Sequence, residues 1–155
     1  MEPTLATPLI AVVEDDPQRA MPLVPMLEGA GYRVVWYRQP QPLLDEVMEH
    51  CPDIVILASR DPRRYDRWHV AAELHEMGCA VIMATDSEAA LREVHATPRG
   101  CHFVGVVRVP YDLRATLATV THALASYPYN ISMTTRPPAA QRTFAEGLQH
   151  SVHAG

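Results

Sequence analysis

Short apolar runs alternate along the chain with longer segments in which apolar and polar residues mix. Five runs have the length of strands: 9–13, 32–37, 54–58, 80–84 and 102–109. Unbroken runs rich in valine and isoleucine are typical of strands buried on both faces. The mixed segments predict helices over about 17–28, 42–50, 68–77, 87–95 and 112–126. This alternation predicts an α/β fold, a doubly wound, five-stranded parallel sheet with helices on both faces.

The first predicted helix has favourable residues at its N-terminus and unfavourable ones in its interior. Asp16 can cap it, with Pro17 at the first helical position, where a missing N–H costs nothing. Pro22 and Pro25 follow inside the helix, where a proline costs about 3 kcal/mol. We therefore expect a distorted helix, or one that becomes regular only near Pro22.

Composition and pattern divide the chain into a lead-in at 1–7, one domain at 8–126 and a linker or tail at 127–155. One interpretation of the tail is that it contains a short helix at 144–152. The formal charge of −5 argues against direct nucleic-acid binding through a broad basic face. No apolar run reaches the length of a membrane span, and the first residues lack the layout of a signal peptide. We expect a cytoplasmic protein without a membrane segment.

Three acids, Glu14, Asp15 and Asp16, directly follow the first strand. In open parallel sheets, ligands bind at the carboxyl ends of the strands, so this acidic corner is the candidate site. A structural alternative is that these carboxylates cap the helix that follows and interact with its dipole. Similarly, Thr85 and Glu88 are spaced for a capping box at the fourth helix.

Residues 8–126 resemble the receiver domain of bacterial response regulators. The motifs that carry the resemblance are VVEDDP (12–17), GY (31–32), PDIVIL (52–57), Pro62, VIMAT (81–85) and VPYDL (109–113). The resemblance implies the strand order 2-1-3-4-5.

The resemblance also implies a phosphorylation pocket, and this chain departs from it at two positions. Glu14 and Asp15 match the family's magnesium-binding acids, and Thr85 matches its hydroxyl residue. The position of the phosphate-accepting aspartate is Ala58, and that of the lysine is Val109. A methyl group cannot accept a phosphoryl group, so no catalytic residue is expected. With one ligand lost, Mg²⁺ binding by the two acids is expected to be weak or absent.

Substitutes for the missing groups are few. Arg108 adjoins Val109, but successive strand residues point to opposite faces, so Arg108 should not reach the pocket. Asp61, in the loop after the third strand, is a conceivable surrogate acceptor. Val106 stands where the family often has an aromatic switch residue. The predicted degenerate pocket consists of Glu14, Asp15, Asp16, Ala58, Thr85 and Val109.

These residues predict a phosphorylation-independent signalling module that acts through protein partners, has no enzymatic activity and needs no cofactor. By the resemblance, the interaction face, also the predicted homodimer interface, contains Leu91, Val94, His95, Val106, Arg108, Tyr111, Leu117, Val120 and Thr121. Two alternatives stay open. The altered pocket could take a small organic effector, or the chain could be the amino-terminal part of a longer transcription regulator or enzyme.

Overall fold

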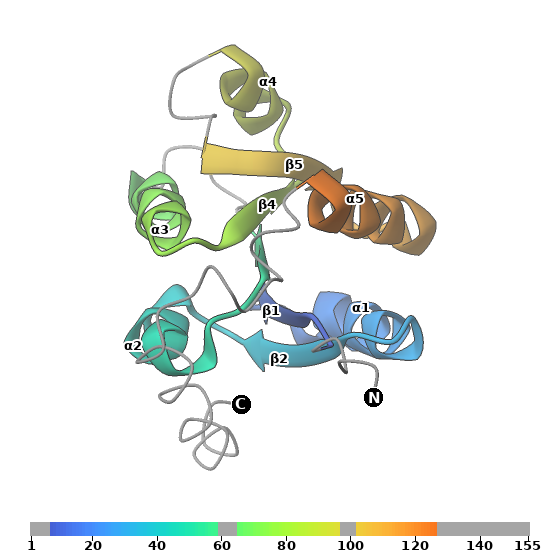
Figure 1. The fold of residues 1–155 in the computed structure, drawn as a ribbon. Coiled ribbons are helices and arrows are strands. Elements are labelled where there is room, and N and C mark those ends of the chain that lie inside the picture. The colour runs from blue at the N-terminus through green and yellow to red at the C-terminus, as the bar shows by residue number, and fades with distance from the viewer. Residues whose placement is uncertain (1–6, 59–64, 97–101, 127–155) are drawn as a thin grey trace.

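The computed structural model describes residues 7–58, 65–96 and 102–126, and shows a sheet between layers of helices (Figure 1). The strands are β1 (Leu9–Val13), β2 (Arg33–Tyr37), β3 (Ile54–Ala58), β4 (Ala80–Thr85) and β5 (Phe103–Arg108). The helices are α1 (Pro17–Gly29), α2 (Pro40–His50), α3 (Tyr65–Glu76), α4 (Glu88–Ala96) and α5 (Leu113–Ser126). Strands and helices alternate throughout, which confirms the predicted α/β fold.

The sheet order is β2-β1-β3-β4-β5, and all neighbouring strands are parallel. The implied order 2-1-3-4-5 is therefore confirmed. Val13 at the end of β1 pairs with Leu57, which pairs with Met83 of β4. The central strands thus end together, and the residues that follow them meet at one edge of the sheet.

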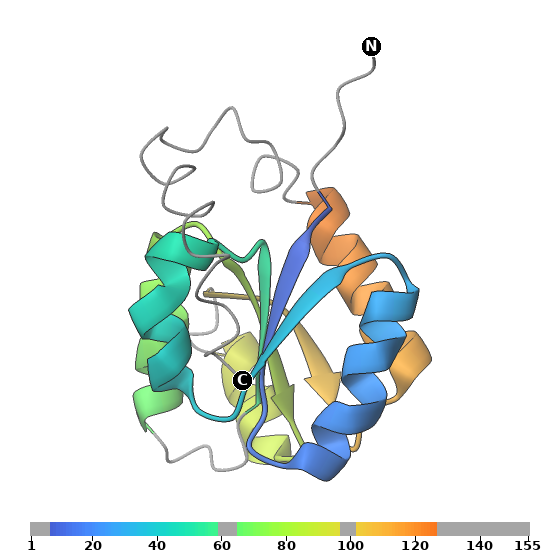
Figure 2. The ribbon, with the colours of Figure 1, turned by 90° about the horizontal axis from the view of Figure 1, so that it is seen from below.

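Alternate strand residues face opposite helix layers. Helices α1 and α5 lie on one side of the sheet, and α2 and α3 lie on the other (Figures 1 and 2). The α1/α5-side core includes Ile10, Ile56, Ile82, Leu23, Leu27 and Val120. The α2/α3-side core includes Val13, Leu57, Met83, Leu43 and Leu74. Burial on both faces explains the unbroken apolar runs of β1, β3 and β4.

Helix α1 is one continuous helix from Pro17, so the expectation that it becomes regular only near Pro22 is wrong. Pro22 and Pro25 are both exposed, and so are Gln18 and Met21, whose carbonyl groups the two prolines leave without a helical donor. Water can therefore satisfy these carbonyl groups. The predicted cap is present: the Asp16 Oδ1 accepts a hydrogen bond of 2.9 Å from the backbone N–H two residues later. Burial of Leu23 against the sheet adds the packing that a proline-containing helix needs.

The predicted capping box of α4 is also wrong. Thr85 still belongs to β4, and its Oγ1 accepts a hydrogen bond of 3.0 Å from the Ser87 N–H. Ser87 is the cap, because its Oγ accepts from the Ala90 N–H at 3.2 Å. Glu88 does not reach back to the backbone, since its carboxylate pairs with the Arg108 guanidinium on β5.

Some of the other helix ends lie a few residues from their predicted positions, and others agree with the prediction. Helix α2 begins at Pro40, two residues before the predicted start, and α3 begins at Tyr65, three residues early. Asp112 caps α5 as predicted, with Oδ1 accepting from the Ala115 N–H at 3.1 Å. Gly78 ends the α3 segment with a φ of +90°, which favours glycine.

Several predictions fall on residues outside those that the structure describes. These are the lead-in, Asp61, and the tail with its short helix at 144–152. The boundaries of the domain at 8–126 therefore stay a prediction. Within the described ranges, no helix is both long and apolar enough to cross a bilayer.

Candidate functional site

Glu14 lies at the centre of the carboxyl edge of the sheet, directly after β1. Its side chain is only 1% exposed. Its backbone N–H donates to the Tyr37 carbonyl at 2.9 Å, and its carbonyl accepts from the Trp36 Nε1 at 2.8 Å. These two bonds to β2 hold the Glu14 backbone in place at the edge of the sheet.

Both oxygens of the Glu14 carboxylate have partners within the chain. The Oε2 accepts a hydrogen bond of 3.1 Å from the Asp16 N–H. The Oε1 accepts one of 3.2 Å from the Tyr111 hydroxyl, which lies 97 residues further along the chain. Tyr111 stands between β5 and α5, so this contact connects the end of β1 to the start of α5.

Tyr111, predicted for the interaction face, is only partly exposed. Its ring packs against the α1/α5-side core, and its hydroxyl donates to Glu14. Sequence reasoning missed this role. The available signal is its position, since Tyr111 is the first aromatic residue after β5, at the edge where Glu14 lies.

Burial dominates the ionisation of this pair. It raises the pKa of Glu14 above the ordinary 4.5, and hydrogen bonding with Asp15 also raises it. The Asp16 N–H, the Tyr111 hydroxyl and the positive charge of Arg19 act in the opposite direction. Burial likewise raises the pKa of Tyr111, and the nearby Glu14 charge adds to this effect. The Tyr111 hydroxyl therefore remains a hydrogen-bond donor.

The other two acids of the corner have separate roles. Asp16 caps α1, and its Oδ2 lies 3.8 Å from the Arg19 Nε. Asp15 is exposed, between a buried acid and a capping acid. The capping alternative therefore holds for Asp16, whereas Glu14 is a buried hydrogen-bond acceptor and Asp15 is the most exposed of the three acids.

The positions of the family's acceptor and lysine are apolar and nearly closed. Ala58 is 8% exposed and Val109 5% exposed, and both belong to the α1/α5-side core that Tyr111 also contacts. The Val109 N–H donates to the Thr85 carbonyl at 3.2 Å. Thr85 is fully buried, and its hydroxyl is used in the turn before α4. The structure thus brings Glu14, Ala58, Val109 and Tyr111 together and directs the Thr85 hydroxyl to a backbone group.

This corner does not fit a magnesium ion. Mg²⁺ requires octahedral oxygen ligands that it can approach closely. Both Glu14 oxygens accept hydrogen bonds from the chain, and Ala58 offers no oxygen from its side chain. Among the residues described, no three His, Cys, Asp or Glu side chains gather in a way that could hold a metal.

Tyr111→Phe is expected to lower the free energy of unfolding by about 1 kcal/mol, because it leaves the Glu14 Oε1 without its donor. Urea denaturation measures this change. Tyr32→Phe is the matched control, since the Tyr32 ring also packs on the α1/α5-side core and its hydroxyl makes no hydrogen bond within the described part of the chain. Equal losses in both variants would show that the contact with Glu14 contributes nothing.

The stability should also depend on pH through Glu14. The folded chain keeps the Glu14 proton to a higher pH than the unfolded chain does, so this proton stabilises the fold below pH 4.5. That contribution is lost as pH rises through the raised pKa. The free energy of unfolding of the parent, relative to Glu14→Gln, should therefore decrease over this window. A difference that is constant with pH would contradict burial as the dominant influence on Glu14.

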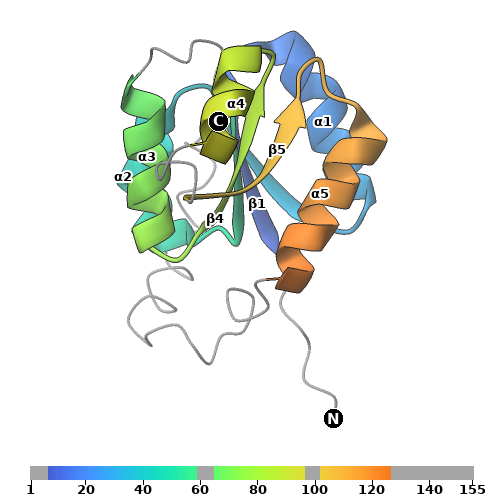
Figure 3. The same ribbon diagram turned by 90° about the horizontal axis from the view of Figure 1, so that it is seen from above.

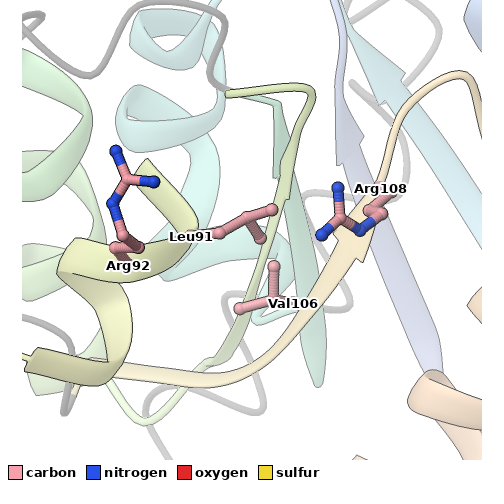
Figure 4. Close-up of a pocket in the computed structure, with 4 residues that line it drawn as sticks. All are labelled: Leu91, Arg92, Val106 and Arg108. Atoms are coloured by element: carbon pink, nitrogen blue, oxygen red, sulfur yellow. The ribbon is translucent and has the colours of Figure 1, made fainter. Parts of the chain in front are cut away.

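A hollow of about 340 Å³ lies between α4 and β5, lined by Leu91, Arg92, Val106 and Arg108. Figure 4 shows Leu91 and Val106 between the two arginines. Figures 1 and 3 place α4 beside β5 at the edge of the sheet, with α5 on the other side of that strand. Three of the residues predicted for the interaction face thus gather around one hollow.

The other residues predicted for the interaction face differ in burial. Val120 is fully buried in the α1/α5-side core and cannot contact a partner, so its assignment is wrong. Leu117 is partly buried against the same core, and Val94 packs against the other core. Thr121 is exposed. The side chain of His95 lies outside the described part of the structure.

The chain is similar to known proteins in sequence and in structure. No family model matches the chain. Protein Rrf1 of Nitratidesulfovibrio vulgaris is 30% identical over 121 residues, covering 76% of this chain and 83% of Rrf1. A response regulator from Thermotoga maritima has a TM-score of 0.64 at 17% identity, covering 77% of this chain and 99% of its own. A response regulator receiver protein from Burkholderia phymatum has a TM-score of 0.64 at 24% identity, with coverages of 77% and 96%.

The chain belongs to the receiver domains of response regulators. The two solved structures share its fold, and Rrf1 extends the similarity to the sequence. In this receiver domain, the acid pair is present as Glu14 and Asp15, whereas β3 ends in Ala58 and the residue after β5 is Val109. A receiver domain is a signalling module, and the question for this one is how it is switched.

Proposed function

We propose that this receiver domain signals without phosphorylation, by binding other proteins. The observation that carries the proposal is the closure of the acidic corner by the chain itself. Tyr111 donates to the buried Glu14, and Ala58 and Val109 pack in the core beside it. A ligand shifts an equilibrium between two states only if it binds one of them better. At the positions of the family's acceptor and lysine, Ala58 and Val109 offer a phosphoryl group neither a nucleophile nor a cation.

The proposed partners are proteins, and the proposed surface is the α4–β5 edge. The −5 charge of the chain disfavours nucleic acid, so any role in transcription would be indirect or belong to another domain. Catalysis is not part of the proposal, and we expect the protein in the cytoplasm. Homodimerisation through the same edge stays a prediction, which sedimentation velocity on the full chain tests.

The test uses acetyl phosphate and Mg²⁺, with the intact mass of the full chain as the readout. We expect no phosphoryl adduct. The double variant Ala58→Asp, Val109→Lys supplies the two missing groups and is the positive control for the reaction. A stoichiometric adduct on the parent chain would overturn the proposal, and its loss in Asp61→Asn would then identify Asp61 as a surrogate acceptor.

A further inference from the structure

We propose that His75 and His102 together bind a divalent transition-metal ion of the Zn²⁺ class, at the edge of the sheet where the strands begin. Glu14 follows β1 whereas His102 precedes β5, so in this parallel sheet the two residues lie at opposite edges. The inference goes beyond the proposed function and does not depend on it. It follows from the contact between the two imidazoles and from an unpaired ring nitrogen.

The two imidazoles come from separate elements and contact each other. His75 lies in the last turn of α3, and His102 directly precedes β5. Their ring centroids are 5.3 Å apart, with an angle of 60° between the ring planes. A second ring contact, between Trp68 of α3 and Phe103 of β5, also holds the helix against the start of the strand (Figure 1). The fold therefore keeps the two histidines side by side.

The separation of the rings is that of two ligands on one metal ion. With Zn–N bonds of about 2.1 Å and tetrahedral geometry, the centroids of two ligating imidazoles lie about 5 Å apart. The Nδ1 of His102 is buried and has no hydrogen-bond partner within the described part of the chain. A buried polar atom without a partner calls for an explanation, and a metal ion is one group that binds an imidazole nitrogen. His75 is exposed, so its ring can turn a nitrogen towards the same ion.

The ligand pair selects the class of ion. Imidazole nitrogens suit Zn²⁺, Ni²⁺ and Cu²⁺, whereas Mg²⁺ and Ca²⁺ require oxygen ligands. Two histidines leave the other coordination positions to water, so this is an open site with reversible binding, unlike a closed structural zinc site with four protein ligands. The ion would lie near the C-terminal end of α3, where the helix dipole favours positive charge.

A titration of the full chain with zinc chloride, followed by NMR of the histidine ring nitrogens, tests this proposal. The chain has eight histidines, so the readout must resolve single rings. We expect the ring signals of His75 and His102 to shift together and to saturate, while magnesium chloride leaves both unchanged.

Two variants separate ligation from ring packing. His75→Phe keeps an aromatic ring and removes both nitrogens. It should weaken zinc binding at His102 by at least about tenfold, because loss of even an outer partner of a metal ligand costs that much. His69→Phe is the matched control, since His69 is exposed on the same helix and pairs with Glu73 instead, and it should leave zinc binding at His102 unchanged.

The proposal is overturned if zinc leaves both ring signals unchanged, or if it shifts only one of the two. It is also overturned if His102 binds zinc as tightly in His75→Phe as in the parent, because the two rings would then form an aromatic contact only. Failure of the proposed function has a different signature, a phosphoryl adduct on the parent chain, which would leave the zinc site unaffected.

Discussion

Ala58→Asp is expected to lower the free energy of unfolding by about 3 kcal/mol, because it places a carboxylate in the apolar core without a cation beside it. Ala58 is 8% exposed and packs in the same core as Val109. The last β1–β3 pair is Val13 with Leu57, so the new acid would stand next to Glu14, which is itself buried. Chemical denaturation by urea at neutral pH measures the loss.

Two controls assign this loss to charge. Ala58→Asn has nearly the same shape without the charge and should cost clearly less. Adding Val109→Lys to Ala58→Asp should recover part of the loss, as a favourable coupling between the two positions, since contacting charges are not additive. If Ala58→Asp were as stable as the parent, the end of β3 would be open to solvent. That result would contradict the closure of the corner beside Glu14.

Leu23→Ala is expected to cost about 3 kcal/mol, because it removes a fully buried side chain and leaves a cavity between α1 and the sheet. Helix α1 depends on this packing more than most helices do, since two interior prolines deprive it of backbone hydrogen bonds. The same loss should appear as a lower midpoint of urea denaturation with an unchanged slope.

Met21→Ala is the matched control on the same helix. Met21 is 68% exposed, so its truncation removes little buried surface and should change the free energy of unfolding by less than about 0.5 kcal/mol. Similar losses in the two variants would mean that α1 does not pack as described.

The fold could be predicted because its signals are local and repeated. Each buried strand is an unbroken apolar run. The residues that start and end helices, such as Asp112 and Gly78, can be recognised from their type alone. The errors arose where local rules compete. Thr85 and Glu88 have the spacing of a capping box, but β4 extends through Thr85, so Ser87 takes the cap.

The candidate site could be predicted only in part. Aligning the motifs of this chain with those of the receiver family places Ala58 at the acceptor position and Val109 at the lysine position, so the loss of both groups could be predicted. The contact that closes the corner is not visible, because Glu14 and Tyr111 are 97 residues apart and only the folded sheet brings them together. Surface assignments fail for a similar reason. Val120 lies on a helix of the predicted face but points into the core.

Under the proposed function, the corner beside Glu14 has neither room nor a ligand for a phosphoryl group. A titration of the full chain with beryllofluoride and Mg²⁺, followed by backbone amide NMR, tests it most directly. We predict no saturable shifts at the amides of Ala58, Thr85 and Val109. Saturable shifts centred on Ala58 would mean that the corner binds a phosphoryl mimic, and would contradict the account.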